Sequence, residues 1–255
     1  MSITSIVERS WSLLRPTPGR AYSADGVVTL QPMAQPKKPA DQQSFEGRQD
    51  GHASGADAMR LARRLFLSPG TGTQPQVVIF SEVEGQREKA HVAARTAEIL
   101  ASRLSPKPVC VIDGDWARPS LHEYFALSNE LGCCQFLAHS APACDFSKQD
   151  AASPNLWVMP SGKPLSTPVE WELAEQLGAR IKSLREEFAY VLIQAPPATE
   201  PATLAFAQAG DGLVLTIEAH TTTKALAMNA TRYLKEAGVR LLGAVLTERS
   251  HADAR

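Results

Sequence analysis

The chain has almost no excess charge of either sign. It contains 26 Lys and Arg and 27 Asp and Glu, which gives a formal net charge of −1. Such a chain creates no strong field, so nucleic acid is not an expected partner. No apolar run reaches the roughly 18 residues that a membrane span needs. Glu8, Arg9 and Ser10 interrupt the first fifteen residues, which therefore do not resemble a secretory signal. We expect a cytoplasmic protein without a transmembrane segment.

The four cysteines form no C-x-x-C pair, and no histidine spacing completes a zinc site, so no metal site is predicted. Cys110 lies in an apolar run and is expected in the core. Cys133 and Cys134 are expected to pack within a helix. No G-x-G-x-x-G follows any predicted strand, which excludes a dinucleotide-dependent dehydrogenase of the usual kind.

Residues 1–52 differ in composition from the rest of the chain. Five prolines (Pro16, Pro18, Pro32, Pro36 and Pro39) stand among Gly, Ser, Gln and Asp, with few large apolar residues. Such a stretch buries too little surface to offset the entropy lost on ordering. We therefore expect a flexible Pro-rich tail over 1–52, followed by one folded domain over 53–255.

A possible helix at the start of the chain is the exception within this tail. Its apolar residues recur at helical spacing: Ile3, Ile6, Val7, Trp11 and Leu14. A helix this short is marginal unless it packs on something. It could pack on its own domain, or it could dock on a partner or a membrane surface. Its only cations are Arg9 and Arg15, which argues against strong lipid binding.

From residue 53 onward, short apolar runs alternate with helical patterns. The expected strands are 77–80, 109–112, 156–159, 190–193, 213–217 and 241–246. The expected helices are 57–67, 89–103, a stretch after Pro119, 170–187, 201–209 and 222–237, the last ended by Gly238. Continuous Val-, Ile- and Leu-rich strands separated by helices predict a mostly parallel sheet that is buried on both faces. The fold class is therefore α/β, a doubly wound three-layer α/β/α sandwich that binds ligands at the carboxyl ends of its strands.

Four segments contain the candidate functional residues at the carboxyl ends of the predicted strands. Residues 81–90 follow the first strand, and Asp113-Gly114-Asp115 opens the segment after the second strand. Gln194-Ala195-Pro196-Pro197 follows a third strand, and Val158-Met159-Pro160-Ser161-Gly162 ends another.

In order and spacing these segments resemble the cytoplasmic tyrosine autokinases of bacterial capsule and exopolysaccharide export, which are P-loop proteins related to the MinD and ParA ATPases. The family's motifs are S-x-x-P-G-E-G-K-S/T (Walker A), I-D-x-D-x-R-x-P-x-x-H (Walker A′) and Y-V-I-I-D-x-P-P (Walker B). The resemblance covers about residues 53–247. It implies a P-loop NTPase-like fold with its nucleotide site at the carboxyl edge.

The Walker A segment departs from the family pattern. Gly85 is kept, but Gln86, Arg87, Glu88, Lys89 and Ala90 stand on the family's E-G-K-S-T. Arg87 replaces a glycine that lets the loop wrap the phosphates. Glu88 replaces the lysine, which reverses a charge beside a polyanion and costs several kcal/mol at an effective dielectric of about 20. A register shifted by one residue puts Lys89 on the lysine position, but Ala90 then offers no hydroxyl for Mg²⁺.

The Walker B and Walker A′ segments differ in what they keep. Gln194 replaces the Walker B aspartate, and a neutral amide is a weak ligand for Mg²⁺. Asp113 and Asp115 keep the D-x-D spacing. In the family the first of them belongs to the catalytic and metal apparatus. Either aspartate could instead satisfy loop amides or cap a helix.

The family's E-x-x-R-x-x-R helix, a subunit contact, corresponds here to Asp57, Arg60 and Arg63. The resemblance implies an oligomer interface at these residues. The alternative is a solvated helix face with one intrahelical ion pair, worth a few tenths of a kcal/mol.

The resemblance and its departures together predict a non-catalytic, pseudokinase-like adaptor or regulator of exopolysaccharide or capsule biosynthesis. Its implied partner is an inner-membrane polysaccharide chain-length (co-polymerase) protein, through which it could be peripheral at the inner membrane. It is expected to form a homo- or hetero-oligomer without a cofactor. One alternative is an active tyrosine autokinase or ATPase that uses ATP and Mg²⁺ through Lys89, Asp113 and Asp115. The other is a MinD- or ParA-like positioning factor.

Overall fold

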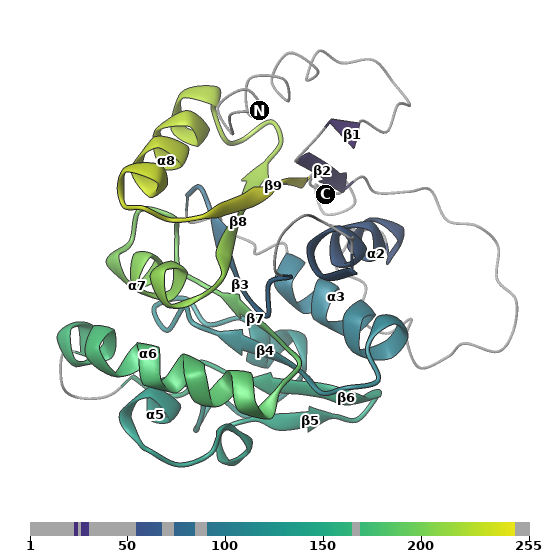
Figure 1. The fold of residues 1–255 in the computed structure, drawn as a ribbon, viewed down its shortest axis with the longest axis vertical. Coiled ribbons are helices and arrows are strands. Elements are labelled where there is room, and N and C mark those ends of the chain that lie inside the picture. The colour runs from purple at the N-terminus through teal and green to yellow at the C-terminus, as the bar shows by residue number, and fades with distance from the viewer. Residues whose placement is uncertain are drawn as a thin grey trace, which may run out of the picture.

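A mostly parallel sheet runs through the middle of the computed structural model (Figure 1). The structure describes residues 23–24, 27–30, 55–67, 74–84, 91–164 and 169–247. Its strands are β1 (Ser23–Ala24), β2 (Val27–Leu30), β3 (Val77–Glu82), β4 (Val109–Asp113), β5 (Lys148–Asp150), β6 (Ser153–Met159), β7 (Tyr190–Gln194), β8 (Gly212–Glu218) and β9 (Leu241–Thr247). Their order is β1-β2-β9-β8-β3-β7-β4-β6-β5. Only the outermost described pairs, β1–β2 and β5–β6, are antiparallel.

The central strands bury both of their faces because their residues are apolar at nearly every position before their carboxyl ends. In β3, Val77 and Ile79 pack into one core cluster, whereas Val78 and Phe80 pack into the other. Successive side chains of a strand point to opposite faces of the sheet, so a strand covered on both sides needs a continuous apolar run. This agrees with the parallel sheet that was predicted from the sequence.

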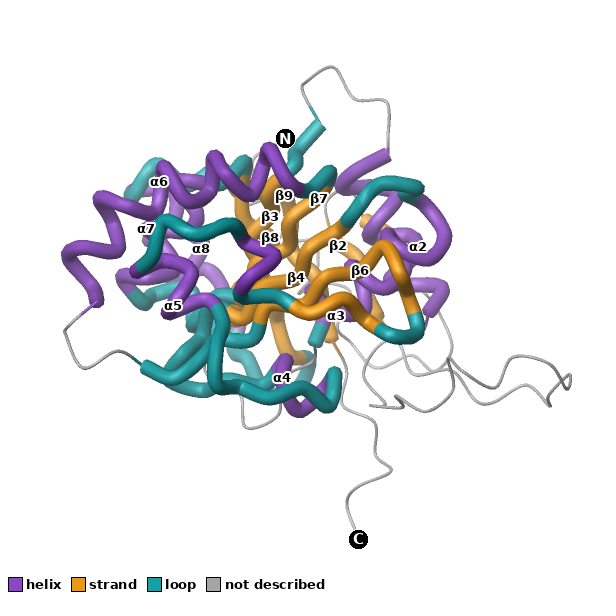
Figure 2. The backbone as a smooth tube through the Cα atoms, turned by 90° about the horizontal axis from the view of Figure 1, so that it is seen from below, coloured by secondary structure: helices purple, strands orange, loops and turns teal. Residues whose placement is uncertain are grey.

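Helices cover both faces of the sheet. The helical segments are α2 (Gly55–Ala62) with the π-helical turn η1 (Arg63–Leu67), α3 (Val92–Ile99) with the π-helical turn η2 (Leu100–Leu104), α4 (Leu121–Tyr124), α5 (Cys133–Ala138), the 3₁₀ turn η3 (Ala143–Asp145), α6 (Val169–Glu187), α7 (Pro201–Ala209) and α8 (Lys224–Glu236). α2 and α3 pack on one face, and α6, α7 and α8 pack on the other (Figure 1). Figure 2 shows the strands between these two helix layers. The predicted three-layer α/β/α sandwich is confirmed.

Helix boundaries follow local signals in the sequence. α7 begins with Pro201 in its first turn, where a missing amide hydrogen costs nothing. At the start of α8 the Thr223 hydroxyl accepts a hydrogen bond from the Leu226 amide at 3.3 Å. The helix gives way to Gly238 at φ 76°, a left-handed conformation that glycine adopts without strain. Gly238 is the residue at which the sequence predicted the end of this helix.

Two parts of the sheet were not predicted. β1 and β2 lie within the segment for which we expected a flexible tail, and β2 pairs in parallel with β9 at the sheet edge. The run Val27–Leu30 is too short to stand out among prolines, and its pairing with β9 is a long-range contact that local composition does not report. β5 also escaped prediction, because Lys148-Gln149-Asp150 has no apolar residue. The remaining residues of 1–52 lie outside the described ranges, so the prediction of flexibility there stays a prediction.

Candidate functional site

Three of the predicted segments meet at the carboxyl edge of the sheet. β4 and β7 are neighbouring parallel strands, and Asp113 at the end of β4 pairs in register with Gln194 at the end of β7. β3 lies on the other side of β7, where Phe80 pairs with Gln194 and Ser81 follows. Parallel strands bring their carboxyl ends to one edge, which is why segments far apart in the sequence converge here.

The Asp113 carboxylate holds the loop that follows β4. Its side chain is fully buried, and its Oδ2 accepts hydrogen bonds from the amides of Ser120 at 2.8 Å and Leu121 at 2.9 Å. Its Oδ1 accepts one from the Asp115 amide at 3.2 Å. Leu121 is the first residue of α4, so the carboxylate satisfies amides at the start of that helix. The Asp113 side chain therefore holds the loop 113–121 in place through these hydrogen bonds.

Asp115 closes a second, smaller turn in the same loop. Its side chain is 1% exposed, and its Oδ1 accepts a hydrogen bond from the Arg118 amide at 3.1 Å. Its Oδ2 lies 3.1 Å from the Arg118 guanidinium Nη2, which forms an ion pair within the loop. Both oxygens are therefore engaged by one residue three positions further along the chain.

Gln194 links the neighbouring strand to this loop. Its side-chain Nε2 donates to the Ser120 hydroxyl at 2.9 Å, and its backbone carbonyl accepts from the Gly114 amide at 2.8 Å. Ser120 thus donates its amide to Asp113 and accepts from Gln194 with its hydroxyl. Gly114 is required at its place, because a Cβ there would lie 2.9 Å from a ring carbon of Phe206. Sequence reasoning assigned no role to Ser120 or Gly114, since neither stands at a position that the family's motifs mark.

A small cavity lies beside these residues at the ends of β3, β7 and β8. Its described lining includes Ser81, His91, Gln194 and Thr216, and its volume is about 20 Å³. That volume holds about one water molecule. Ser81 donates its hydroxyl hydrogen bond to the carbonyl of Pro196 at 2.6 Å. The predicted loop residues Gly85, Gln86, Arg87, Glu88, Lys89 and Ala90 lie outside the described residues, so their arrangement stays a prediction.

The polar side chains of this edge form hydrogen bonds and an ion pair with the protein itself. Mg²⁺ takes hard oxygen ligands that can enter an octahedral shell. Asp113 already accepts three backbone hydrogen bonds, Asp115 pairs with Arg118, and Gln194 contributes only a neutral amide. These three amides occupy most of the roughly four acceptor sites of the Asp113 carboxylate. The geometry favours a polar network that holds the protein's own backbone.

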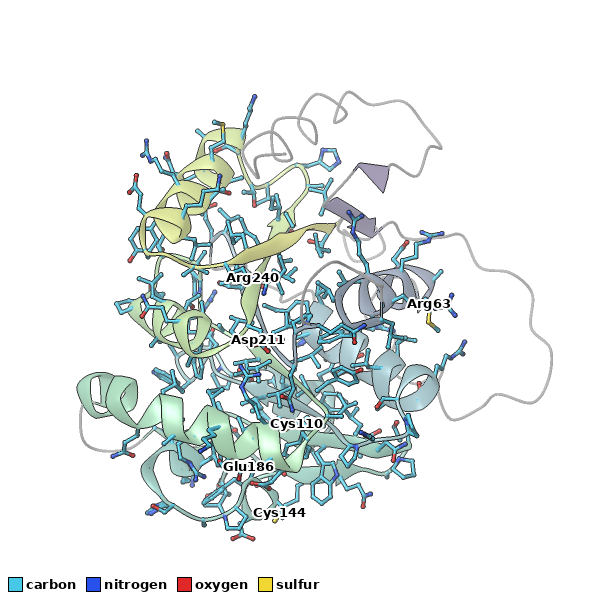
Figure 3. The ribbon with its side chains drawn as sticks, in the orientation of Figure 1. Arg63, Cys110, Cys144, Glu186, Asp211 and Arg240 are labelled. Atoms are coloured by element: carbon cyan, nitrogen blue, oxygen red, sulfur yellow. The ribbon has the colours of Figure 1, made fainter. Side chains whose placement is uncertain are left out.

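The helix residues Asp57, Arg60 and Arg63 do not form one uniform exposed face. The Asp57 side chain is 7% exposed and lies 2.6 Å from Nη1 of Arg60, whose side chain is 64% exposed. Arg63 begins the π-helical turn after α2 and lies on its outer side (Figure 3). The intrahelical pair that we weighed as an alternative is therefore present. Its presence leaves the predicted oligomer interface as a prediction.

The cysteines have the structural character expected for them. Cys110 lies in the middle of the fold and Cys144 at its periphery (Figure 3). Burial raises the pKa of Cys110 and of Cys133, and burial together with the nearby Asp113 raises the pKa of Cys134 to about 11. A thiol with a raised pKa is a poor nucleophile near neutral pH. These three side chains therefore pack the core.

The chain is similar in sequence to bacterial tyrosine kinases. No family model matches the chain. The tyrosine-protein kinase ptk of Acinetobacter johnsonii is 29% identical over 199 residues, which cover 77% of this chain and 26% of ptk. The putative tyrosine-protein kinase CapB of Staphylococcus aureus is 27% identical over 139 residues, 54% of this chain and 60% of CapB. These similarities fit the bacterial tyrosine kinases that the sequence motifs resemble. The chain spans about a quarter of ptk's length, so it matches one part of that relative.

Solved structures of this family share the fold. The chimerical protein CapA2B2 superposes with a TM-score of 0.67 at 21% identity, covering 76% of this chain and 84% of that one. The kinase domain of VpsO superposes with a TM-score of 0.65 at 21% identity, covering 77% and 96%. The cell division protein MinD of Aquifex aeolicus gives 0.53 at 17% identity, covering 67% of each chain. The sequence similarity to tyrosine kinases and the fold shared with these structures agree with the resemblance found in the sequence. No helix in the described part of the chain combines the length and the apolar character that crossing a membrane requires.

Proposed function

We propose that this chain is a non-catalytic member of its family, a pseudokinase-like adaptor that acts by binding other proteins. The observation that carries the proposal is the hydrogen-bond network of Asp113, Ser120 and Gln194, in which Asp113 accepts from backbone amides and Gln194 donates to the Ser120 hydroxyl. The sequence supports it, because Glu88 stands where the family has its phosphate-binding lysine.

A charge argument gives the expected size of the effect. The family's lysine adds a positive charge beside the phosphates, whereas Glu88 adds a negative one. Exchange of one for the other a few ångströms from a triphosphate changes the binding free energy by several kcal/mol at an effective dielectric of about 20. A loss of 4 kcal/mol corresponds to about a thousandfold in affinity. Binding of Mg-ATP at micromolar concentrations is therefore not expected.

Isothermal titration of the full chain with Mg-ATP tests this part of the proposal. We expect no saturable heat at micromolar nucleotide. A matched variant carrying Arg87→Gly, Glu88→Lys, Lys89→Thr and Gln194→Asp restores the family residues and should gain affinity. Micromolar binding by the natural chain, abolished by Asp113→Asn, would favour the active kinase instead.

The active kinase remains the second candidate because Asp113 and Asp115 keep the family's D-x-D spacing at the carboxyl edge. It would need the loop 85–90 to bind phosphate with Arg87 and Glu88 in place. Incorporation of labelled γ-phosphate into tyrosine of the purified chain would establish it.

The proposed setting is capsule or exopolysaccharide export, with an inner-membrane chain-length protein as the partner. This rests on the family relation alone, and the chain spans only a quarter of ptk. Affinity purification of the tagged chain from its own cells tests it. Recovery of a polysaccharide-export membrane protein is expected, whereas recovery of division or chromosome-segregation proteins would favour the MinD-like alternative.

A further inference from the structure

A groove of about 600 Å³ runs along one face of α8, outside the network described above. Its floor and walls come from α8, from the end of β3 at Val83 and Glu84, and from the segment 197–200 that leads into α7. Two apolar side chains of α8 stand in it, Leu226 at 37% exposure and Tyr233 at 38%. They are seven residues apart, so they lie on one face of the helix two turns from each other.

The groove is more acidic than basic. Glu84, Glu200 and Glu236 line it, against the single lining cation Arg232 among the described residues. An apolar strip flanked by carboxylates suits a helix that has an apolar face and positive charges beside it. The occupant should therefore be amphipathic and carry more arginine than acid.

Residues 1–15 of this chain have that chemistry. Their apolar residues, Ile3, Ile6, Val7, Trp11 and Leu14, recur at helical spacing, and Arg9 and Arg15 outnumber Glu8. A fifteen-residue helix is marginal by itself, so a surface that covers its apolar face would be needed to keep it folded. The groove offers an apolar strip of helical spacing on the same molecule.

The chain geometry allows the segment to reach the groove. β1 is antiparallel to β2, and β2 is parallel to β9, so the chain enters Ser23 from the carboxyl edge of the sheet. That is the edge where Glu84 follows β3. β1 is three strands from β8 and four from β3 in the sheet order, about 14 and 19 Å at a strand spacing of about 4.8 Å. Residues 16–22 can extend over about 23 Å. Figure 1 shows β2, β9, β8 and α8 in this succession.

We infer that residues 1–15 dock as a helix in the α8 groove of the same chain, with Trp11 and Leu14 against Leu226 and Tyr233 and the arginines beside the groove's carboxylates.

Hydrogen exchange of the full chain, followed by mass spectrometry, tests the docking. The amides of residues 3–14 should exchange at least about tenfold more slowly than in an unstructured peptide. Leu226→Asp should remove this protection, and Glu200→Lys should reduce it. Leu131→Asp is the matched control, because Leu131 is 56% exposed and lies outside the groove. Fast exchange of residues 3–14 in the natural chain, or protection that survives Leu226→Asp, would overturn the inference.

Crosslinking separates docking in the same chain from exchange between two copies. A photoreactive benzophenone amino acid at position 11 should crosslink to peptides of α8. In a mixture of unlabelled and ¹⁵N-labelled chains, the crosslinked peptides should carry one isotope only. Mixed pairs would assign the groove to a second copy, and crosslinks elsewhere would assign the segment to another surface; either result contradicts the inference.

Discussion

Two carboxylates serve opposite edges of the same sheet, and they do so in different ways. Asp113, at the carboxyl edge, binds amides of Asp115, Ser120 and Leu121, all within the loop that follows it. Asp211, just before β8 at the amino edge, binds groups from elements far away in the sequence. It accepts from the amides of Gln76 at 2.7 Å and Val77 at 2.8 Å.

Asp211 is also held by a bidentate ion pair with Arg185 of α6, with both nitrogen–oxygen distances at 2.8 Å. Burial by itself raises the pKa of Asp211, but the hydrogen bonds from Arg185, Val77 and Gln76 outweigh it and lower that pKa. Asp211 therefore clamps three elements, whereas the three amides that Asp113 is seen to bind all belong to one loop. The two acids differ in the reach of their partners, but both accept hydrogen bonds from backbone amides of the protein.

The largest expected effect is that of Asp113→Ala. This change leaves three amides without an acceptor in a fully buried place, and we expect a loss of about 3 kcal/mol in the free energy of unfolding. Urea titration followed by circular dichroism measures it. Asp113→Asn keeps an acceptor oxygen and should lose about half as much. A loss below about 1 kcal/mol for Asp113→Ala would show that the carboxylate is not needed for the loop.

The second effect concerns Asp211→Asn, which removes the charge from the clamp at the amino edge. Hydrogen bonds to charged groups contribute about 1.5–3 kcal/mol, and the pair with Arg185 is partly exposed, so we expect a loss of about 2 kcal/mol. The same urea titration measures it. If Asp211→Asn lowers the free energy of unfolding by no more than about 0.5 kcal/mol, as for an exposed residue, Asp211 does not act as a clamp.

The clamp should also show in the pH dependence of stability. Since the folded-state pKa of Asp211 lies below its ordinary value of 3.8, the stabilisation is complete above that value and is lost as the pH falls through the folded pKa. The difference in stability between the natural chain and Asp211→Asn should be constant from neutral pH to about 5 and should shrink below about 4. A difference that grows on acidification has the wrong sign for this account.

A smaller effect is expected for Gln194→Asp, which introduces the family's residue beside Asp113. Two buried carboxylates on paired strands repel each other, so this variant should be about 1 kcal/mol less stable at pH 7 than the neutral control Gln194→Asn. The gap between the two variants should close in acid, where the added carboxyl group is protonated. Equal stability at pH 7 would mean that the edge tolerates a second charge.

The smallest effect is expected for Arg60→Ala on α2. Its ion pair with Asp57 is intrahelical and its side chain is 64% exposed, so the free energy of unfolding should change by less than about 0.5 kcal/mol.

If the helix is the subunit contact of the family, Arg63→Ala should lower the oligomer mass in light scattering while leaving the unfolding midpoint unchanged. An oligomer that is unaffected by both changes would place the contact elsewhere.

Much of the sheet could be predicted because its central strands are runs of mostly apolar residues and alternate with helices. β4 is such a strand, buried along its whole length from Val109 to Asp113. β2 and β5 escaped prediction, because β2 depends on a long-range pairing with β9 and β5 has a polar sequence.

The site was predictable only in part. Motif positions located Asp113, Asp115 and Gln194 at one edge, since parallel strands end together. Sequence reasoning left open whether the aspartates bind loop amides. It could not decide this, because hydrogen-bond partners depend on the path of the loop through Ser120 and Leu121.

The central claim is that the residues at the family's metal positions bind the protein itself and do not bind a nucleotide. The most direct measurement is the free energy of unfolding of the full chain in urea with and without 5 mM Mg-ATP. A ligand present at about 100 times its dissociation constant adds about 2.7 kcal/mol to that free energy. The account predicts no change beyond the effect of matched ionic strength. An increase of about 2–3 kcal/mol that is absent in Asp113→Asn would contradict it.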